Sequence, residues 1–303
     1  MRPSAPPTPP DTAAPVAGPI LPTAACIPLN PHPSISPAQH SATGPAYPSR
    51  LPRDPTPLGP DGLPATRWTD PRVAADYANR DDDAERELVW PLLAQAVRPT
   101  AARRVPGRPD GLVLELGCGL GGLARRLADE HWLRVYAVDV SPTMHRLGAA
   151  RFRDAWVVRT MPDARGRLPL RRAQCTGAIV QRVLLHLPHP CLVTGLLTEA
   201  RRVLRPGAPL AIVESDTRAG ERSRPDGEAY AEHYRLRDGA TLATTAWRHS
   251  PEIIVDCLAD AGFDVEEIQQ LSVPVPVSLS VSASGCGPEA ETGALLLYRA
   301  KAV

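Results

Sequence analysis

Short apolar runs alternate with longer helical segments along most of the chain after residue 110. The runs that read as buried strands are 112–116, 135–138, 155–158, 176–181, 209–214, 264–271 and 295–300. Between them, helical composition or spacing predicts helices over 123–128, 142–152, 192–204 and 251–261. Strands that alternate with helices favour a parallel sheet that is covered on both faces.

The chain before residue 110 divides into two regions. Residues 1–65 are rich in Pro, Ala, Ser and Thr and show no helical or strand period. Such a segment buries too little apolar surface to offset its ordering entropy, so we expect a disordered Pro-rich tail. Two interpretations of this segment stay open: a tail with a function, or an artefact of the choice of start site for the sequence. Residues 66–303 are expected to form the folded domain, with apolar anchors and an acid-rich run between Trp68 and Val97 predicting a helical cap.

One polar stretch, residues 217–248, interrupts the alternation of strands and helices. We expect it to be irregular and to form a lid or an acceptor pocket. His233 lies within it and His249 directly follows it, and both are expected at the surface. The loop between the last two strands, at 274–292, is expected to be flexible.

Composition narrows the classes of partner and compartment. A formal net charge of +1 gives no electrostatic case for a nucleic-acid partner. The six cysteines are widely spaced without a Cys-x-x-Cys pair, so we expect neither disulfides nor a metal site, and a cytoplasmic setting. No apolar run reaches membrane-spanning length, and prolines interrupt every candidate signal core, so we expect no membrane partner. The oligomeric state stays open.

The strand expected at 112–116 leads through a cluster of glycines into a helix. The glycines are Gly117, Gly119, Gly121 and Gly122. Glycine tolerates the backbone angles of a sharp turn and lets a ligand approach bare backbone. The N-terminus of the following helix presents free N–H groups to that ligand. This strand, glycine loop and helix predict a binding site for a nucleotide-type cofactor.

Two cofactors fit the glycine loop. Gly117-x-Gly119-x-x-Gly122, with Asp139 about 20 residues further on, matches the dinucleotide fingerprint. Alternatively, Glu115-x-Gly117-x-Gly119-x-Gly121 resembles the first motif of class I S-adenosylmethionine (SAM)-dependent methyltransferases. With either cofactor, a carboxylate at Asp139 can accept both ribose hydroxyls.

Later segments resemble the same methyltransferase family in the order that the family requires. They are 163–170, an acid and a loop before Leu-Pro; 183–188, after the fourth strand; 199–207, a helix-to-strand junction; and 261–263, a turn before the sixth strand. A dehydrogenase needs none of these segments, so we favour SAM. The resemblance covers the chain after the tail and is to the broad group with quinone-biosynthesis and small-molecule enzymes.

This resemblance implies a Rossmann-like, seven-stranded, mostly parallel sheet with helices on both faces and the last strand antiparallel. It also implies that Asp163 takes the adenine amino group, although Leu170 replaces the family's usual aromatic and Cys175-Thr176 replaces its usual Phe-Asp. The residues expected to bind the cofactor are Glu115, Gly117, Cys118, Gly119, Gly121, Asp139, Val140, Met144, Asp163, Ala164, Gln181 and Tyr77.

Methyl transfer is an in-line displacement at a carbon that the cofactor already activates, so the protein mainly orients the acceptor. A base is needed only when the acceptor loses a proton, and His186 is the candidate, with structural packing as its alternative role. The expected function is methyl transfer to a small molecule, leaving S-adenosylhomocysteine. The alternatives are a SAM-dependent cyclisation or group transfer, and a SAM-binding protein without catalysis.

Overall fold

The computed structural model describes most of the chain after residue 110 and short parts before it. The described residues are 68, 74–75, 83–98, 111–151, 157–163, 165–216, 226–235, 241–274 and 292–303. The expected tail at 1–65, the loop at 275–291 and the candidate residues Tyr77 and Ala164 lie outside the described residues.

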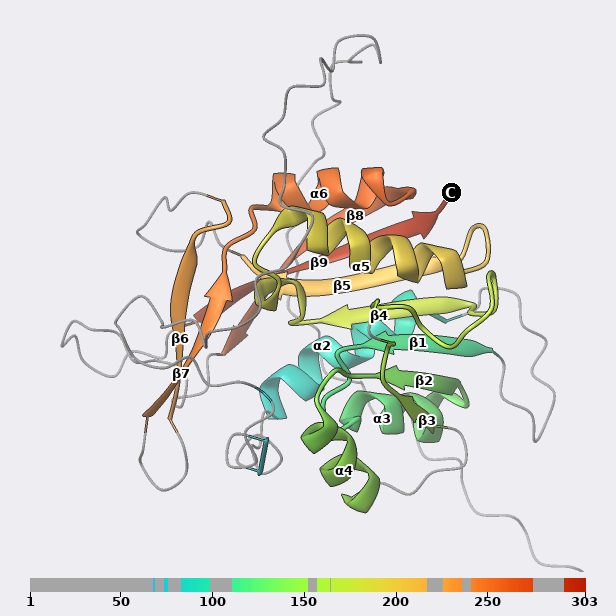
Figure 1. The fold of residues 1–303 in the computed structure, drawn as a ribbon, viewed down its shortest axis with the longest axis horizontal. Coiled ribbons are helices and arrows are strands. Elements are labelled where there is room, and N and C mark those ends of the chain that lie inside the picture. Colours follow the sequence, from blue (N-terminus) through green and yellow to red (C-terminus); the bar gives the residue numbers. More distant parts are fainter. Residues whose placement is uncertain are drawn as a thin grey trace, which may run out of the picture.

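A seven-stranded sheet with the order β3-β2-β1-β4-β5-β9-β8 forms the centre of the fold (Figure 1). Its parallel strands are β1 (Leu112–Leu116), β2 (Arg134–Val138), β3 (Val157–Thr160), β4 (Gly177–Gln181) and β5 (Pro209–Ser215). The last strand, β9 (Thr292–Ala302), is antiparallel to both β5 and β8 (Phe263–Pro274). The predicted mostly parallel sheet with an antiparallel last strand is therefore confirmed.

Helices cover both faces of the sheet, because the central strands are apolar on both sides. The helices are α2 (Asp83–Ala96), α3 (Gly122–His131), α4 (Pro142–Arg151), the 3-10 helix η1 (Leu184–His186), α5 (Pro190–Val203) and α6 (Pro251–Asp260). One core cluster joins the sheet to α5 and α6, and a second joins it to α2 and α3. Figure 1 shows α5 and α6 together on one side of the strands.

A two-stranded antiparallel sheet follows β5 and stands apart from the main sheet (Figure 1). Its strands are β6 (Ala229–Arg235) and β7 (Thr241–Trp247). The expectation of irregular structure over 217–248 is therefore wrong for the described part of that stretch. Tyrosine and threonine, which recur in β6 and β7, are residues that favour strands, and the pairing of the two strands satisfies their backbone. The hairpin contacts η1 near the carboxyl ends of the parallel strands.

Three local expectations change in the structure. The third strand continues to Thr160, past the expected end at Val158, because it pairs with β2 up to Val138. His249 is only 4% exposed, so its expected surface position is wrong. Its Nε2 lies 2.8 Å from the Leu187 carbonyl oxygen, which gives this polar ring a partner inside the protein.

Candidate cofactor-binding site

The β1–α3 loop turns sharply at the carboxyl end of β1. Gly117 has a φ of 71°, and Gly121, the N-cap of α3, has a φ of 83°. Both angles lie in the left-handed region that side chains disfavour. A Cβ at Gly117 would lie 2.2 Å from Cγ2 of Val183, directly before η1. The loop is therefore packed closely against the segment that follows β4.

The Asp139 carboxylate joins this loop to the start of α4. Its Oδ2 accepts a hydrogen bond from the Gly119 N–H at 2.8 Å, and its Oδ1 accepts one from the Ser141 N–H at 2.8 Å. The Cys118 N–H also donates to the Val138 carbonyl oxygen at 2.9 Å. A carboxylate oxygen can accept more than one hydrogen bond, so Asp139 still has acceptor capacity for ribose hydroxyls.

Beyond Asp139, neighbouring side chains take opposite directions. Val140 is 70% exposed, whereas Met144 is buried and packs with Leu120 and Ala74. The Ser141 Oγ accepts from the Met144 N–H at 3.2 Å, so the Ser141 side chain caps the start of α4. Val140 thus offers an apolar surface next to Asp139, while Met144 supports the loop from inside.

Two groups under the glycine loop are buried and titratable. Burial raises the pKa of Glu115 from 4.5 to about 8, with Arg159 lowering that pKa and Asp139 raising it. The Glu115 carboxylate accepts the backbone N–H of Ala124 in α3, so the expected backbone partner is present. Burial also raises the pKa of the Cys118 thiol well above its ordinary value. Cys118 is therefore a packing residue with little thiolate character.

The segment after β4 is anchored by a carboxylate that the sequence analysis did not single out. Gln181 is the last residue of β4 and is half-buried. Oε1 of Glu214, at the end of β5, accepts from the N–H groups of Val183 and Leu184 at 2.8 and 2.7 Å. An acid at the end of an otherwise apolar strand is the signal that could have identified it, because buried charges need partners.

His186 ends η1 and contacts the N-terminal cap region. The Trp68 Nε1–H donates to His186 Nε2 at 3.2 Å, with the two rings edge to face and 5.5 Å apart. The Ser141 Oγ donates to the Trp68 carbonyl oxygen at 2.8 Å. Trp68 thus bridges the end of β2 and the segment after β4. An acceptor Nε2 places the proton of a neutral His186 on Nδ1.

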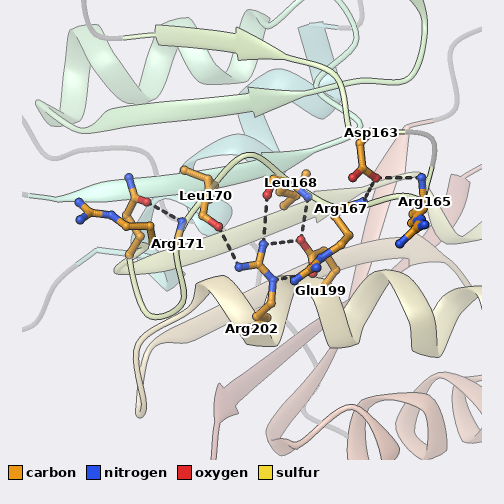
Figure 2. A network of polar contacts seen from close by, with 9 residues as sticks. Asp163, Arg165, Arg167, Leu168, Leu170, Arg171, Glu199 and Arg202 are labelled. Carbon is orange, nitrogen blue, oxygen red and sulfur yellow. Dashed lines mark hydrogen bonds and ion pairs between the residues drawn. The ribbon is translucent and has the colours of Figure 1, made fainter.

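The connection from β3 to β4 is held by its own acid and by helix α5 (Figure 2). Oδ1 of Asp163 accepts from the Arg167 and Arg165 N–H groups at 2.9 and 2.8 Å. The Asp163 side chain is exposed. The two hydrogen bonds hold the pKa of Asp163 below its ordinary value, which favours the carboxylate form. Its position after β3 is the one expected for an adenine contact. That role stays a proposal.

Glu199 and Arg202, one turn apart on α5, hold the other end of this connection (Figure 2). Glu199 accepts from the Leu168 N–H at 2.7 Å. Arg202 binds Glu199 through Nε at 2.7 Å and donates to the carbonyl oxygens of Leu170 and Leu168 at 2.8 and 3.1 Å. This bidentate pair ties the connection to α5, which explains why the sequence places an acid and an arginine three residues apart there.

Replacing Arg202 by methionine is expected to lower the free energy of unfolding by about 2–3 kcal/mol at neutral pH, because charge-assisted bonds are lost. Burial raises the pKa of Glu199, but hydrogen bonds from Arg202 and the Leu168 N–H hold it below its ordinary value. Stability from such a depressed carboxyl pKa is present above the unfolded value and is lost as the pH falls through the folded value.

The loss caused by Arg202→Met should therefore shrink when the pH falls below about 4. Denaturant unfolding at pH 7 and at pH 3.5 measures this difference. Arg171→Met is the matched control, since Arg171 is exposed and only its backbone N–H bonds Gln174, at 2.9 Å. Equal losses in the two variants, or a loss independent of pH, would contradict the role of the pair.

Among the described residues, no group of three or more His, Cys, Asp or Glu side chains could hold a metal ion. None of the helices that the structure describes is long and apolar enough to cross a membrane.

A family model described as a methyltransferase domain matches residues 113–207 of this chain. The matched range runs from β1 to the junction between α5 and β5, so it contains the glycine loop, Asp139, Asp163, His186 and the Glu199–Arg202 pair.

Curated relatives match about half of the chain. An uncharacterized 37.1 kDa protein in transposon TN4556 of Streptomyces fradiae is 32% identical over 147 residues, which are 46% of this chain and 41% of that protein. N-demethylindolmycin N-methyltransferase of Streptomyces griseus is 26% identical over 152 residues, which are 50% of this chain and 62% of that enzyme. The chain therefore spans less than two thirds of the length of either relative.

Among solved structures, the fold is similar to a chain in the complex between the Haloferax volcanii Trm112 methyltransferase activator and the putative methyltransferase. The TM-score is 0.50 at 19% identity, over 78% of this chain and 99% of that one. This likeness concerns the fold. The matched methyltransferase domain contains the glycine loop after β1 and the acid after β2, and this similarity extends over residues 113–207.

Proposed function

We propose that the protein transfers a methyl group from SAM to a small-molecule acceptor and leaves S-adenosylhomocysteine. The observation that carries this proposal is the contact between Asp139 Oδ2 and the Gly119 N–H, 2.8 Å, inside a methyltransferase domain. The Asp139 carboxylate can accept further hydrogen bonds, and it lies beside a loop whose backbone a ligand can approach. The ribose of SAM fits the carboxylate, and the charged methionine part of SAM fits the loop backbone.

The residues around the loop fit the separate parts of SAM. Gly117 and Gly121 keep the loop free of side chains, and Asp139 is assigned to the ribose hydroxyls. The exposed Val140 is assigned to one face of the adenine, and Asp163 to its amino group. Glu115 Oε2 is buried without a hydrogen-bond partner among the described residues, so the site holds acceptor capacity near a cationic ligand.

The remaining assignments complete the cofactor shell. Cys118 and Gly119 contribute backbone near the methionine part, and Gln181 is assigned to the site from its position at the end of β4. Met144 is assigned an indirect role, because it packs against Leu120 of the glycine loop. Tyr77 and Ala164 are assigned as additional contacts although they lie outside the described residues.

SAM brings an activated methyl group, so the chain has to bind it, orient the acceptor and exclude water. The hairpin β6–β7 and η1 are the elements we assign to the acceptor, because they meet beside the carboxyl ends of β4 and β5. His186 is the candidate base. Nε2 of His186 accepts a hydrogen bond from the Trp68 Nε1–H, and that bond must break before Nε2 can take a proton. Any base function of His186 therefore requires Trp68 to move.

A small-molecule acceptor is supported by the Streptomyces griseus relative, whose name describes N-methylation of such a compound. The formal net charge of +1 gives no electrostatic case for a nucleic-acid partner, and neither a nucleic acid nor a membrane forms part of this proposal. A cytoplasmic setting belongs to it as well, since the cysteine spacing fits a reducing compartment.

The test combines binding with turnover. Calorimetry on the full chain should show binding of SAM and of S-adenosylhomocysteine, and none of NAD. Incubation with SAM and a panel of small amines, phenols and carbon acids should give S-adenosylhomocysteine and a product heavier by one methyl group, read by mass spectrometry.

Binding of NAD instead of SAM would overturn the proposal. A product with another mass change would indicate cyclisation or group transfer, and SAM binding without turnover of any acceptor would indicate a non-catalytic binder.

A further inference from the structure

A carboxyl group and a guanidinium face each other under the glycine loop, on strands that are otherwise apolar on this face. Glu115 of β1 pairs in register with Ala137 of β2, and Ala137 pairs with Arg159 of β3. Residues in register on parallel strands point to the same face of a sheet. The small Ala137 side chain between them leaves room for Glu115 and Arg159 to reach toward one another. Neither the family resemblance nor the matched domain assigns a role to Arg159.

The Arg159 guanidinium contacts the loop directly. Its Nη2 donates to the Leu120 carbonyl oxygen at 2.5 Å. A Cβ at Gly121 would lie 2.4 Å from this Nη2, and a Cβ at Gly148 of α4 would lie 2.6 Å from Nη1. Two glycines on different elements therefore make room for one side chain. The guanidinium fills the space between the glycine loop and α4.

Among the described residues, Arg159 is the cation that interacts electrostatically with Glu115. One oxygen of Glu115 accepts the Ala124 N–H, and its Oε2 is buried without a hydrogen-bond partner among the described residues. Arg159 Nη1 is likewise buried without one in the described part of the chain. The charged or titratable groups that act on Glu115 are Arg159 from β3, Asp139 at the end of β2 and the Cys118 thiol. Arg159 is the only cation in that set.

We propose that Arg159 is a positioning residue for the cofactor site, which fixes the Leu120–Gly121 bend and favours the ionised form of Glu115 beneath the bound SAM. The guanidinium holds the carbonyl of Leu120, so the loop presents its N–H groups to the ligand in one arrangement. This inference rests on the proposed function, because it assumes that SAM occupies the loop. An arginine suits the position since its planar fork can bond a carbonyl and face a carboxylate at once.

Calorimetric titration of the full chain with SAM tests the proposal. Arg159→Met should weaken SAM binding about tenfold or more, which corresponds to the loss of one charge-assisted bond. Arg159→Lys should recover part of that loss, because an ammonium restores the charge without the fork. Arg134→Met is the matched control, since Arg134 is an exposed strand arginine and its loss changes the net charge equally. It should bind SAM as the parent does.

A second variant moves the guanidinium without removing it. Gly148→Ala adds a Cβ that would meet the Leu120 carbonyl oxygen at 2.5 Å as well as Arg159. Alanine is the better helix former, so α4 itself should not be weakened. SAM binding should nevertheless fall severalfold, and this effect should be smaller when Arg159 is already methionine. Gly195→Ala in α5 is the control, because nothing lies within 4 Å of the added Cβ there.

The pH dependence separates positioning from simple loss of packing. SAM is cationic, so its affinity should rise as Glu115 ionises, near pH 8 in the parent protein. Removing Arg159 removes the group that lowers the pKa of Glu115, so in Arg159→Met this rise should move to higher pH. Glu115→Gln should abolish it.

The outcomes are distinguishable. A parent chain that binds no SAM overturns the proposed function itself. A parent that binds SAM, with Arg159→Met and Gly148→Ala binding equally well and with the same pH profile, overturns only the role of Arg159. Should Arg159→Met fail to fold, Arg159→Lys and Gly148→Ala decide the matter, because unchanged affinity in both would still refute the positioning role.

Discussion

The variant Gly117→Ala should show no SAM binding at concentrations that saturate the parent protein. The added Cβ would meet Cγ2 of Val183 at 2.2 Å, and the φ of 71° costs a side chain about 1–2 kcal/mol in addition. Val183 begins the segment that Glu214 anchors, so relief of the clash pushes the glycine loop away from η1. Both sides of the candidate site would then be misplaced, and calorimetry should show a loss of more than 100-fold.

Two control variants separate the clash from the backbone strain. Gly207 has a φ of 73° with nothing within 4 Å of an added Cβ, so Gly207→Ala measures the strain alone. It should lower stability and leave SAM affinity unchanged. Gly117→Ala with Val183→Ala removes the clashing methyl groups and should recover part of the affinity. If Gly117→Ala binds SAM as well as Gly207→Ala does, the close packing of the loop against Val183 is not required for binding.

The sheet could be predicted from the sequence because its strands are buried on both faces. A strand such as β1 must be apolar almost throughout, and only Glu115 interrupts it. The glycine loop and the caps at Ser141 and Ser250 are local features, and each follows from residues within a few positions. The order of the later motifs then favoured the methyltransferase fold over the dinucleotide-binding fold, which has a similar glycine loop.

Contacts between distant segments could not be predicted in the same way. Trp68 donates to His186 across 118 positions, and Glu214 bonds Val183 from another strand. Arg159 directly follows the apolar run predicted at 155–158, and only the register across β1, β2 and β3 brings it opposite Glu115. His249 was misjudged for the same reason, since its partner is a carbonyl at Leu187.

The hairpin β6–β7 was missed for a different reason. Its strands form a separate sheet outside the main one, so the two-sided burial of the main sheet does not impose an apolar run on their sequence. Strand pairing alone satisfies their backbone, and pairing leaves little trace in a single sequence.

Replacing Asp139 by alanine should weaken SAM binding by about one to two orders of magnitude, since bonds from the ribose hydroxyls to a carboxylate are charge-assisted. The stability of the free protein should fall as well. Both carboxylate oxygens accept backbone N–H groups, from Gly119 and from Ser141, so two donors lose their partner.

The free energy of unfolding without ligand should therefore fall by about 2–3 kcal/mol, measured by denaturant titration beside calorimetry with SAM. Asp139→Asn should be intermediate, because its amide keeps one oxygen while its NH₂ group faces a backbone donor. Asp129→Ala is the control: Asp129 is an exposed acid on α3 in a pair with Arg125, and such pairs contribute about 0.5 kcal/mol or less. Unchanged SAM affinity in Asp139→Ala would mean that another acid holds the ribose. Unchanged stability would mean that the loop and α4 keep their places without the carboxylate.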